Sequence, residues 1–135
     1  MGGGAQGSSN SREGGCPMML DWSEYHKQGG TGLGELMKLS PDTVRGYRML
    51  SEANAQTGHL DAKTRELISL AVGVTRQCDG CIVVHTDAAL KAGASREEIA
   101  EALGVAISVN AGAALVYSTR ALDAVAAKTQ QAHGA

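Results

Sequence analysis

Hydrophobic residues recur every three or four positions through most of this chain, and strict alternation of apolar and polar residues is rare. That spacing is typical of amphipathic helices and not of half-buried strands. The chain has no Phe, one Trp and three Tyr, so its core has to be built from Leu, Ile, Val, Ala and Met. Small side chains of this kind suit closely packed helices. The sequence therefore predicts an all-α fold, and 135 residues fit one domain.

The first part of the chain differs from the rest in composition. Residues 1–19 are rich in Gly and Ser and have no apolar periodicity, so we expect a flexible tail before a helical domain over residues 20–131. The tail lacks the apolar central region of a signal peptide. Its cysteine, Cys16, is interpreted as an incidental exposed thiol, and a role as a third ligand or as a resolving thiol is the alternative. Three cysteines cannot form a complete set of internal disulfides, and a reducing cytoplasm fits this chain best.

Start and stop signals divide the domain into helices. Asp21 should open a short helix that Gly29 and Gly30 end, and a second short helix is expected over residues 33–39. Ser40 followed by Pro41 is a strong start signal for a helix over residues 41–56. Asp61 should cap the next helix, over residues 62–75.

The C-terminal part is unusually poor in charge. Ser95 and Glu98 form a capping box that opens a helix, the segment Asn110–Gly112 indicates a turn, and a last helix is expected over residues 113–128. No charged side chain occurs between residues 102 and 119. A membrane span is one interpretation, but the small and polar residues in this segment favour helices that pack against copies of the same chain.

The stretch Glu66–His85 carries the chemistry. It holds a C-x-x-C pair, Cys78 and Cys81, with His85 four residues after the second cysteine and Glu66 twelve residues before the first. A C-x-x-C pair is either a redox dithiol or half of a zinc site. If Cys81 lies in a helix, His85 lies one turn away on the same face, as a base for a thiol requires. We interpret the stretch as the site of a cysteine-based redox enzyme.

Glu66 can approach the cysteines only if the helix that carries it ends before them. In one straight helix Glu66 and Cys78 would be about 18 Å apart, at 1.5 Å per residue. Gly73, the β-branched residues after it and the Asp79–Gly80 pair weaken the helix, so we predict a break over residues 76–79. Asp79 would cap the following helix and place Cys81 in its first turn, where the helix dipole favours a thiolate.

With these motifs the sequence resembles the carboxymuconolactone decarboxylase and AhpD-like alkylhydroperoxidase superfamily. The resemblance covers roughly residues 33–127. It rests on the Leu60–Ile68 segment, the Glu66, Cys78, Cys81 and His85 spacing, and the Ala92–Ile99 capping box. It implies an all-α fold with the C-x-x-C at a helix start. It also implies a homo-oligomer, commonly a trimer or hexamer, with the site in or beside a subunit contact.

The resemblance also implies roles for the site residues. Cys81 would attack a hydroperoxide, Cys78 would resolve the product as a disulfide, and His85 with Glu66 would relay protons. The implied partners are a small hydroperoxide or disulfide substrate and a dithiol electron donor, either of the lipoamide type or a thioredoxin-like protein. Well-known members have a second histidine between the cysteines, where this chain has Gly80. A shorter relay and a weaker peroxidase follow from that difference.

Other functions stay open from the sequence. A zinc site would need Cys78, Cys81, His85 and Glu66 as its four ligands, whereas the redox interpretation requires neither metal nor cofactor. A decarboxylase or a non-catalytic binding oligomer of the same fold is the third possibility. Near-balanced charge, with 12 Lys and Arg against 14 Asp and Glu, argues against nucleic acid. His26 and His59 are expected at the surface or at helix caps, and His133 is expected to be incidental.

Overall fold

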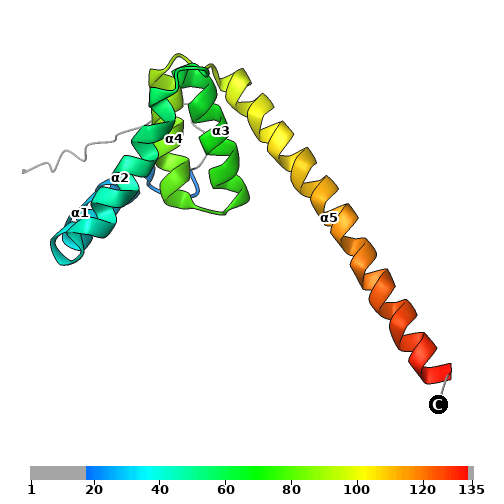
Figure 1. The fold of residues 1–135 in the computed structure, drawn as a ribbon. Helices are drawn as coiled ribbons and strands as arrows, with labels where there is room; N and C mark the ends of the chain where they lie inside the picture. Colours follow the sequence, from blue (N-terminus) through cyan, green and yellow to red (C-terminus); the bar gives the residue numbers. More distant parts are fainter. Residues whose placement is uncertain (1–17, 134–135) are drawn as a thin grey trace, which may run out of the picture.

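The computed structural model describes residues 18–133, and in that range it contains helices and no strand (Figure 1). The all-α fold predicted from the sequence is confirmed. Cys16 and all of the proposed tail except its last two residues lie outside the described range. The helices are α1 (Trp22–Leu39), α2 (Pro41–Gln56), α3 (Ala62–Thr75), α4 (Asp79–Lys91) and α5 (Arg96–His133).

Most helix starts follow the predicted caps. The carboxylates of Asp21 and Asp61 accept hydrogen bonds from the backbone N–H groups of Glu24 and Thr64, at 3.0 and 2.7 Å. At the start of α5, Ser95 and Glu98 form the expected reciprocal pair of side-chain to backbone bonds, at 3.1 and 2.8 Å. Each bond satisfies a backbone donor that the first helical turn leaves free. These local signals therefore predicted the helix starts correctly.

The prediction of two short helices before residue 40 was wrong, because α1 runs without interruption from Trp22 to Leu39. Gly29 and Gly30 lie inside this helix. A glycine costs a helix interior only about 1 kcal/mol relative to alanine. Because helix propagation is cooperative, hydrogen bonds on both sides can carry a helix through such a pair.

The predicted turn at Asn110–Gly112 was also wrong, since α5 is a single helix that continues past the expected end at Lys128. The side chain of Asn110 does not form a turn. Its Nδ2 atom donates hydrogen bonds to the Ala106 carbonyl and to the Thr75 hydroxyl, both at 2.8 Å. Asn110 therefore ties α5 to the end of α3 while the helix continues.

A small core lies where α3, α4 and the first part of α5 pack together. Helix α3 packs against α4 and α5, and α1 contacts α2 and α4 (Figure 1). Few apolar side chains of the described residues are buried, and most of these are small: Val44, Leu70, Ala89, Ala94 and Ala106. A core of this size is meagre for a chain of 135 residues.

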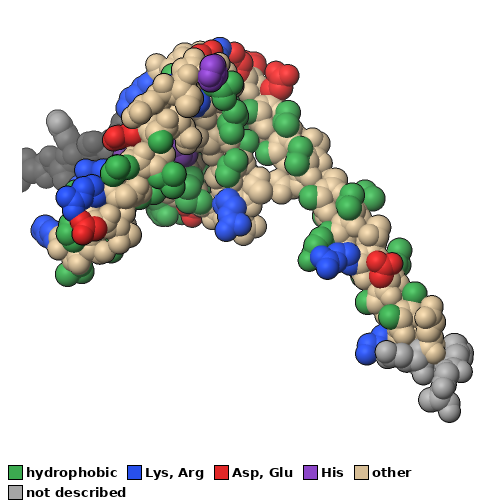
Figure 2. Space-filling view, in the orientation of Figure 1, with side chains coloured by type: hydrophobic (Ala, Val, Ile, Leu, Met, Phe, Trp, Pro, Cys, Tyr) green, Lys and Arg blue, Asp and Glu red, His purple; other side chains and the backbone are tan. Residues whose placement is uncertain are grey.

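The C-terminal part of α5 extends away from the other helices (Figure 1), and apolar side chains lie along its surface (Figure 2). Over Arg96–Gln130 it is long and apolar enough to cross a membrane by length and composition, with a mean hydropathy of 1.7 in its most apolar window. Only 6% of that window is buried. The large exposed apolar residues are Val105, Ile107, Val109, Leu115, Val116, Tyr117, Leu122 and Val125.

An ion pair joins the starts of α3 and α5, and it makes stability depend on pH. Lys63 donates to Glu98 at 2.6 Å. This bond, together with the bond from the Ser95 backbone N–H, holds the pKa of Glu98 below its ordinary value of 4.5. A carboxylate whose pKa is lower in the folded state stabilises the fold above its unfolded value, and that contribution is lost as pH falls through the folded value.

We therefore expect Glu98→Gln to lower the melting temperature at pH 7, by an amount that shrinks as pH falls below about 4.5. Thermal unfolding followed by circular dichroism between pH 3 and 7 measures this difference. Glu97→Gln is the control, because the Glu97 carboxylate has no hydrogen-bond partner among the described residues. A difference in melting temperature between wild type and Glu98→Gln that stayed constant down to pH 3 would contradict this interpretation.

Candidate active site

Helix α3 ends in a turn that reverses the chain just before the first cysteine. The N–H of Gln77 donates to the carbonyl of Val74, and the N–H of Cys78 donates to the carbonyl of Gly73, both at 3.0 Å. These bonds form the Schellman arrangement of a helix C-terminus, with Gln77 in the left-handed region at φ 53°. The break predicted over residues 76–79 is confirmed, and α4 packs back along α3.

Cys78, not Asp79, caps α4, so the predicted cap was wrong by one residue. The reason lies in the preceding turn, which leaves Cys78 extended (φ −106°, ψ 97°) and makes Asp79 the first helical residue. The N–H of Cys81 donates to the Cys78 Sγ atom at 3.2 Å. A sulfur in this position faces the positive end of the helix dipole, which favours a thiolate on Cys78. Cys81 lies in the first turn, as predicted.

Cys78 and Cys81 are joined by a disulfide in this structure, and their Cα atoms are 5.2 Å apart. That separation lies within the usual range for disulfides. Both residues are partly exposed. The structure therefore brings together the two cysteines that the sequence predicts as a redox pair, and it does so in the oxidised form.

Glu66 and His85 meet across the interface between α3 and α4. The Nδ1 atom of His85 lies 2.8 Å from the Oε2 atom of Glu66, although the two residues are 19 positions apart in sequence. Their side chains are 30% and 27% exposed. A neutral imidazole that donates from Nδ1 to this carboxylate would keep its lone pair on Nε2, which is the arrangement that a base requires. The predicted contact between Glu66 and His85 is present.

The structure does not join His85 to a sulfur atom while the disulfide is formed. Among the described side-chain hydrogen bonds, the one that the His85 imidazole makes is to Glu66. His85 nevertheless follows Cys81 by one helical turn, about 6 Å along the axis of α4. The cysteine pair at the start of α4 and the Glu66–His85 pair between α3 and α4 are thus close neighbours that no described hydrogen bond joins.

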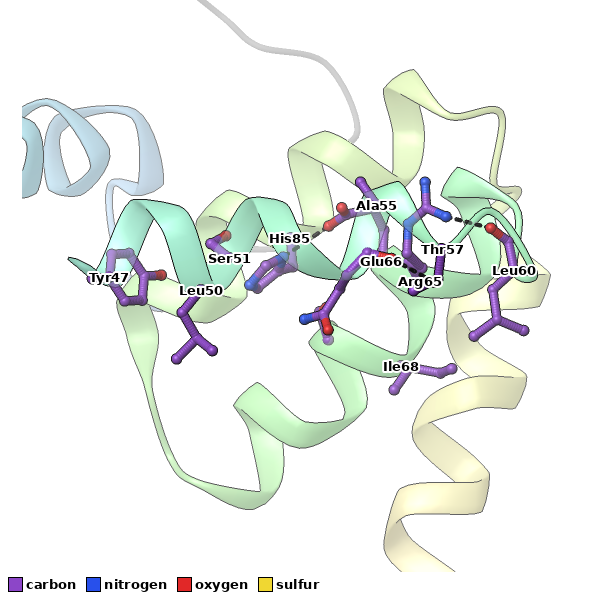
Figure 3. A pocket seen from close by; sticks show the side chains of 12 residues that line it. Tyr47, Leu50, Ser51, Ala55, Thr57, Leu60, Arg65, Glu66, Ile68 and His85 are labelled. Carbon is purple, nitrogen blue, oxygen red and sulfur yellow. Dashed lines mark hydrogen bonds and ion pairs between the residues drawn. The ribbon is translucent and has the colours of Figure 1, made fainter. Parts of the chain in front are cut away.

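A pocket of about 550 Å³ opens beside the Glu66–His85 pair (Figure 3). Its volume falls within the range of small-molecule sites. Neither cysteine lines it. One wall comes from α2 and the loop after it, and the other comes from α3, with His85 contributed by α4. The lining residues are Tyr47, Leu50, Ser51, Asn54, Ala55, Thr57, Leu60, Arg65, Glu66, Ile68, Ser69 and His85.

A second hollow, of about 280 Å³, lies between α1 and α4 and reaches Gly80, the residue next to Cys81. An added Cβ atom at Gly80 would meet no atom within 4 Å. The hollow is lined mainly by apolar groups, and one histidine, His26, is among the lining residues. Its lining residues are Tyr25, His26, Gly29, Gly30, Leu33, Gly80, Val83 and Val84.

Two groups of site residues were not predicted from the sequence. Tyr47, Ser51 and Asn54 line the larger pocket from α2, and they were treated only as helix residues because nothing local marks them. Gly73 was treated only as a helix breaker. The signal that could have identified it is a glycine inside the apolar part of a helix, where alanine would stabilise the helix more unless a neighbouring group leaves no room for a side chain.

The zinc hypothesis gains no geometric support from the described residues. Among the side chains that the structure describes, no group of three or more from His, Cys, Asp and Glu is placed to hold one metal ion. The sulfurs of Cys78 and Cys81 are bonded to each other, and His85 is paired with Glu66. His26 and His59 are both exposed.

The comparisons with known proteins identify a family and several relatives. The profile of the carboxymuconolactone decarboxylase family matches residues 41–124. An uncharacterized protein from Haemophilus influenzae is 49% identical over 107 residues, which cover 79% of this chain and 95% of that protein. "Uncharacterized protein 4 in cox locus" from Paracoccus denitrificans is 37% identical over 90 residues, which cover 67% of this chain and 81% of that protein.

A solved structure shows the same relationship. The crystal structure of an apo carboxymuconolactone decarboxylase family protein from Legionella pneumophila superposes with a TM-score of 0.63 at 38% sequence identity. The alignment covers 76% of this chain and 91% of that chain.

The fold and the site together define an all-helical protein with a cysteine pair at a helix start and a histidine–carboxylate pair one turn away. Such a protein can exchange two electrons through its sulfurs and move a proton through its imidazole. The profile match extends over more than half of the chain, and the two relatives are 49% and 37% identical to it over the aligned residues. The chain belongs to the carboxymuconolactone decarboxylase family.

Proposed function

We propose that this protein is a thiol-dependent oxidoreductase that reduces hydroperoxides or disulfides through Cys78 and Cys81. The observation that carries the proposal is the bonded cysteine pair at the start of α4, one turn before an imidazole held by a carboxylate. Dithiols at helix starts are favoured as thiolates, and an oriented histidine supplies the proton that a leaving oxygen needs.

In the first step the Cys81 thiolate attacks the distal oxygen of a hydroperoxide. The O–O bond breaks, Cys81 becomes a sulfenic acid, and the alcohol leaves with the proton that His85 took from the Cys81 thiol when the thiolate formed. The Cys78 thiolate then attacks the Cys81 sulfur and forms the disulfide. Hydroxide leaves and is protonated to water. The Cys81 N–H directed at Cys78 Sγ favours the thiolate that this second step needs.

An external dithiol completes the cycle. One of its thiolates attacks the disulfide, its second thiol resolves the mixed disulfide, and two electrons return to Cys78 and Cys81. A lipoamide-type dithiol and a thioredoxin-like protein are the two donors that we propose. The apolar hollow next to Gly80 supports an organic hydroperoxide as substrate, because it can hold an apolar group beside the cysteine pair.

Peroxide consumption measured with a panel of dithiol donors tests this function. We expect hydroperoxide loss that depends on dihydrolipoamide or on a reduced thioredoxin-like protein, and that exceeds the rate of the donor alone. Wild-type protein that leaves both peroxides and small disulfides unchanged with every donor would overturn the proposal.

A lyase is the second candidate, because the larger pocket meets Glu66 and His85 but neither cysteine. An acid–base pair in such a pocket suits proton transfer next to a carbonyl group, as decarboxylation of a carboxylated lactone requires. The two functions separate in one variant. Cys81→Ser should keep a lyase activity and lose a peroxidase activity, whereas His85→Gln should weaken both.

We also propose that the protein acts as a homo-oligomer, a trimer or a hexamer, in which copies of the chain cover α5. The small core and the exposed apolar residues of α5 support this proposal. Light scattering should report an oligomer for the wild type at micromolar concentration.

Replacing Leu115, which is 74% exposed in the single chain, by lysine should dissociate the oligomer. Asp123→Lys introduces the same side chain on α5 at an exposed position that is already charged, and it should leave the mass unchanged. A stable wild-type monomer, or equal masses for wild type and Leu115→Lys, would contradict the proposal.

A further inference from the structure

Gly73 lies where α3 passes against the cysteine pair. It is buried, and a Cβ atom added to it would lie 2.8 Å from the Cβ atom of Cys81. Real Cβ atoms do not come this close to one another, so the backbone at one of the two positions would have to move. Rotation of the Cys81 side chain about χ1 cannot relieve the contact, since that rotation does not move its Cβ atom.

Gly73 also holds the other cysteine. Its carbonyl accepts the hydrogen bond from the Cys78 N–H at 3.0 Å. One residue of α3 thus contacts both cysteines, Cys78 through its carbonyl and Cys81 through the face where a side chain would stand. No other glycine described in the structure would place an added Cβ atom within 4 Å of a neighbouring group, and this includes Gly80 between the two cysteines.

We infer that Gly73 is a positioning residue that sets the reduction potential of the Cys78–Cys81 pair. In the oxidised form three links close a tight ring: the contact of Gly73 with Cys81, the disulfide, and the hydrogen bond from Cys78 back to Gly73. In the reduced form the link between the sulfurs is absent, so the start of α4 can shift away from α3. A methyl group at position 73 therefore destabilises the oxidised form more than the reduced form.

Gly73→Ala should then make the pair easier to reduce. When two glutathione thiols reduce the disulfide, the products are two protein thiols and one glutathione disulfide. We expect the equilibrium constant of this reaction to rise at least tenfold in Gly73→Ala, which corresponds to about 30 mV in potential. By linkage, the melting temperature should fall more for the oxidised than for the reduced variant.

Gly80→Ala is the matched control, because it adds the same methyl group between the cysteines, where the structure has open space. Its equilibrium constant for reduction by glutathione should stay within about twofold of the wild-type value. This is a much smaller change in potential than the roughly 30 mV of a tenfold change. Titration of both variants in glutathione buffers, with thiols counted by alkylation and mass spectrometry, measures the shift. Equal potentials for Gly73→Ala and wild type would overturn the inference.

This inference rests on the proposed function only in requiring a reversible disulfide, and the same titration separates the two. A wild-type protein whose cysteine pair never reoxidises would refute the redox function. The contact between Gly73 and Cys81 would then be tested by melting temperatures alone. Cys81→Gly removes the atom that an added methyl would strike. The destabilisation caused by Gly73→Ala should be at least halved in that background, whether or not the single variant folds well. An undiminished loss in melting temperature would contradict the close approach.

Discussion

Cys81→Ser is expected to abolish hydroperoxide turnover, lowering the rate to that of the dithiol donor alone. A serine hydroxyl is not ionised near neutral pH and is a poor nucleophile without strong activation, so the attacking group is lost. Cys78→Ser should keep the first step, because Cys81 remains, but it should stop after one equivalent of peroxide with a sulfenic acid on Cys81. Dimedone labelling followed by peptide mass spectrometry identifies that residue.

The two cysteine variants also decide which sulfur attacks. Cys78 faces the amide of Cys81 at the helix start, whereas Cys81 precedes His85 by one turn. The helix dipole favours Cys78 as a thiolate, and the histidine favours Cys81. Suppose that Cys81→Ser consumed its first equivalent of peroxide as fast as the wild type and carried the dimedone adduct on Cys78. The roles of the two cysteines would then be reversed.

His85→Gln should slow alkylation of Cys81 at neutral pH by roughly tenfold, the second large effect that we expect. Free thiols are mostly protonated at pH 7, so loss of a base lowers the thiolate fraction, while the lower reactivity of a more acidic thiolate limits the change. Glu66→Gln keeps the imidazole but replaces the carboxylate at 2.8 Å with an amide, and it should slow alkylation by roughly threefold.

Iodoacetamide rates on reduced protein in a Cys78→Ser background, measured from pH 5 to 9, separate this effect from changes in folding. The rate profile should move to higher pH in both relay variants. His59→Gln is the control, because His59 is exposed and outside the pocket. Identical profiles for wild type, His85→Gln and Glu66→Gln would show that the pair is only a structural contact.

The sequence predicted those parts of the fold that depend on short-range rules. The caps at Asp21, Asp61 and Ser95 each need residues no more than three positions apart, and all three form as predicted. A short stretch of weak helix formers likewise predicted the break before Cys78. The pairing of Glu66 with His85 followed from that break, since a reversal there places the two residues opposite each other.

The wrong predictions arose where a local signal met a stronger effect from outside the local sequence. Gly29 and Gly30 weaken α1 without ending it, because the helix continues on both sides. Asn110 indicates a turn when read with its neighbours, but its amide bonds to Thr75 on α3, 35 residues away. No pattern within α5 could reveal that partner.

The site was predicted as a set of residues but not as a shape. Four residues were named from their spacing, and the structure groups them as two bonded pairs. The pocket wall from α2 depends on where that helix lies relative to α3, which no motif encodes. The role of Gly73 depends on the distance between two helices, so it became visible only in three dimensions.

Stoichiometric oxidation of the reduced protein tests the central claim most directly. Reduced, desalted wild-type protein is treated with one equivalent of an organic hydroperoxide and no donor, then quenched, digested and analysed by mass spectrometry. The redox function predicts that each hydroperoxide consumed removes two thiols and yields one alcohol and one Cys78–Cys81 disulfide, which dihydrolipoamide reduces again. Unchanged thiols, or a disulfide mainly between Cys81 and Cys16, would contradict it.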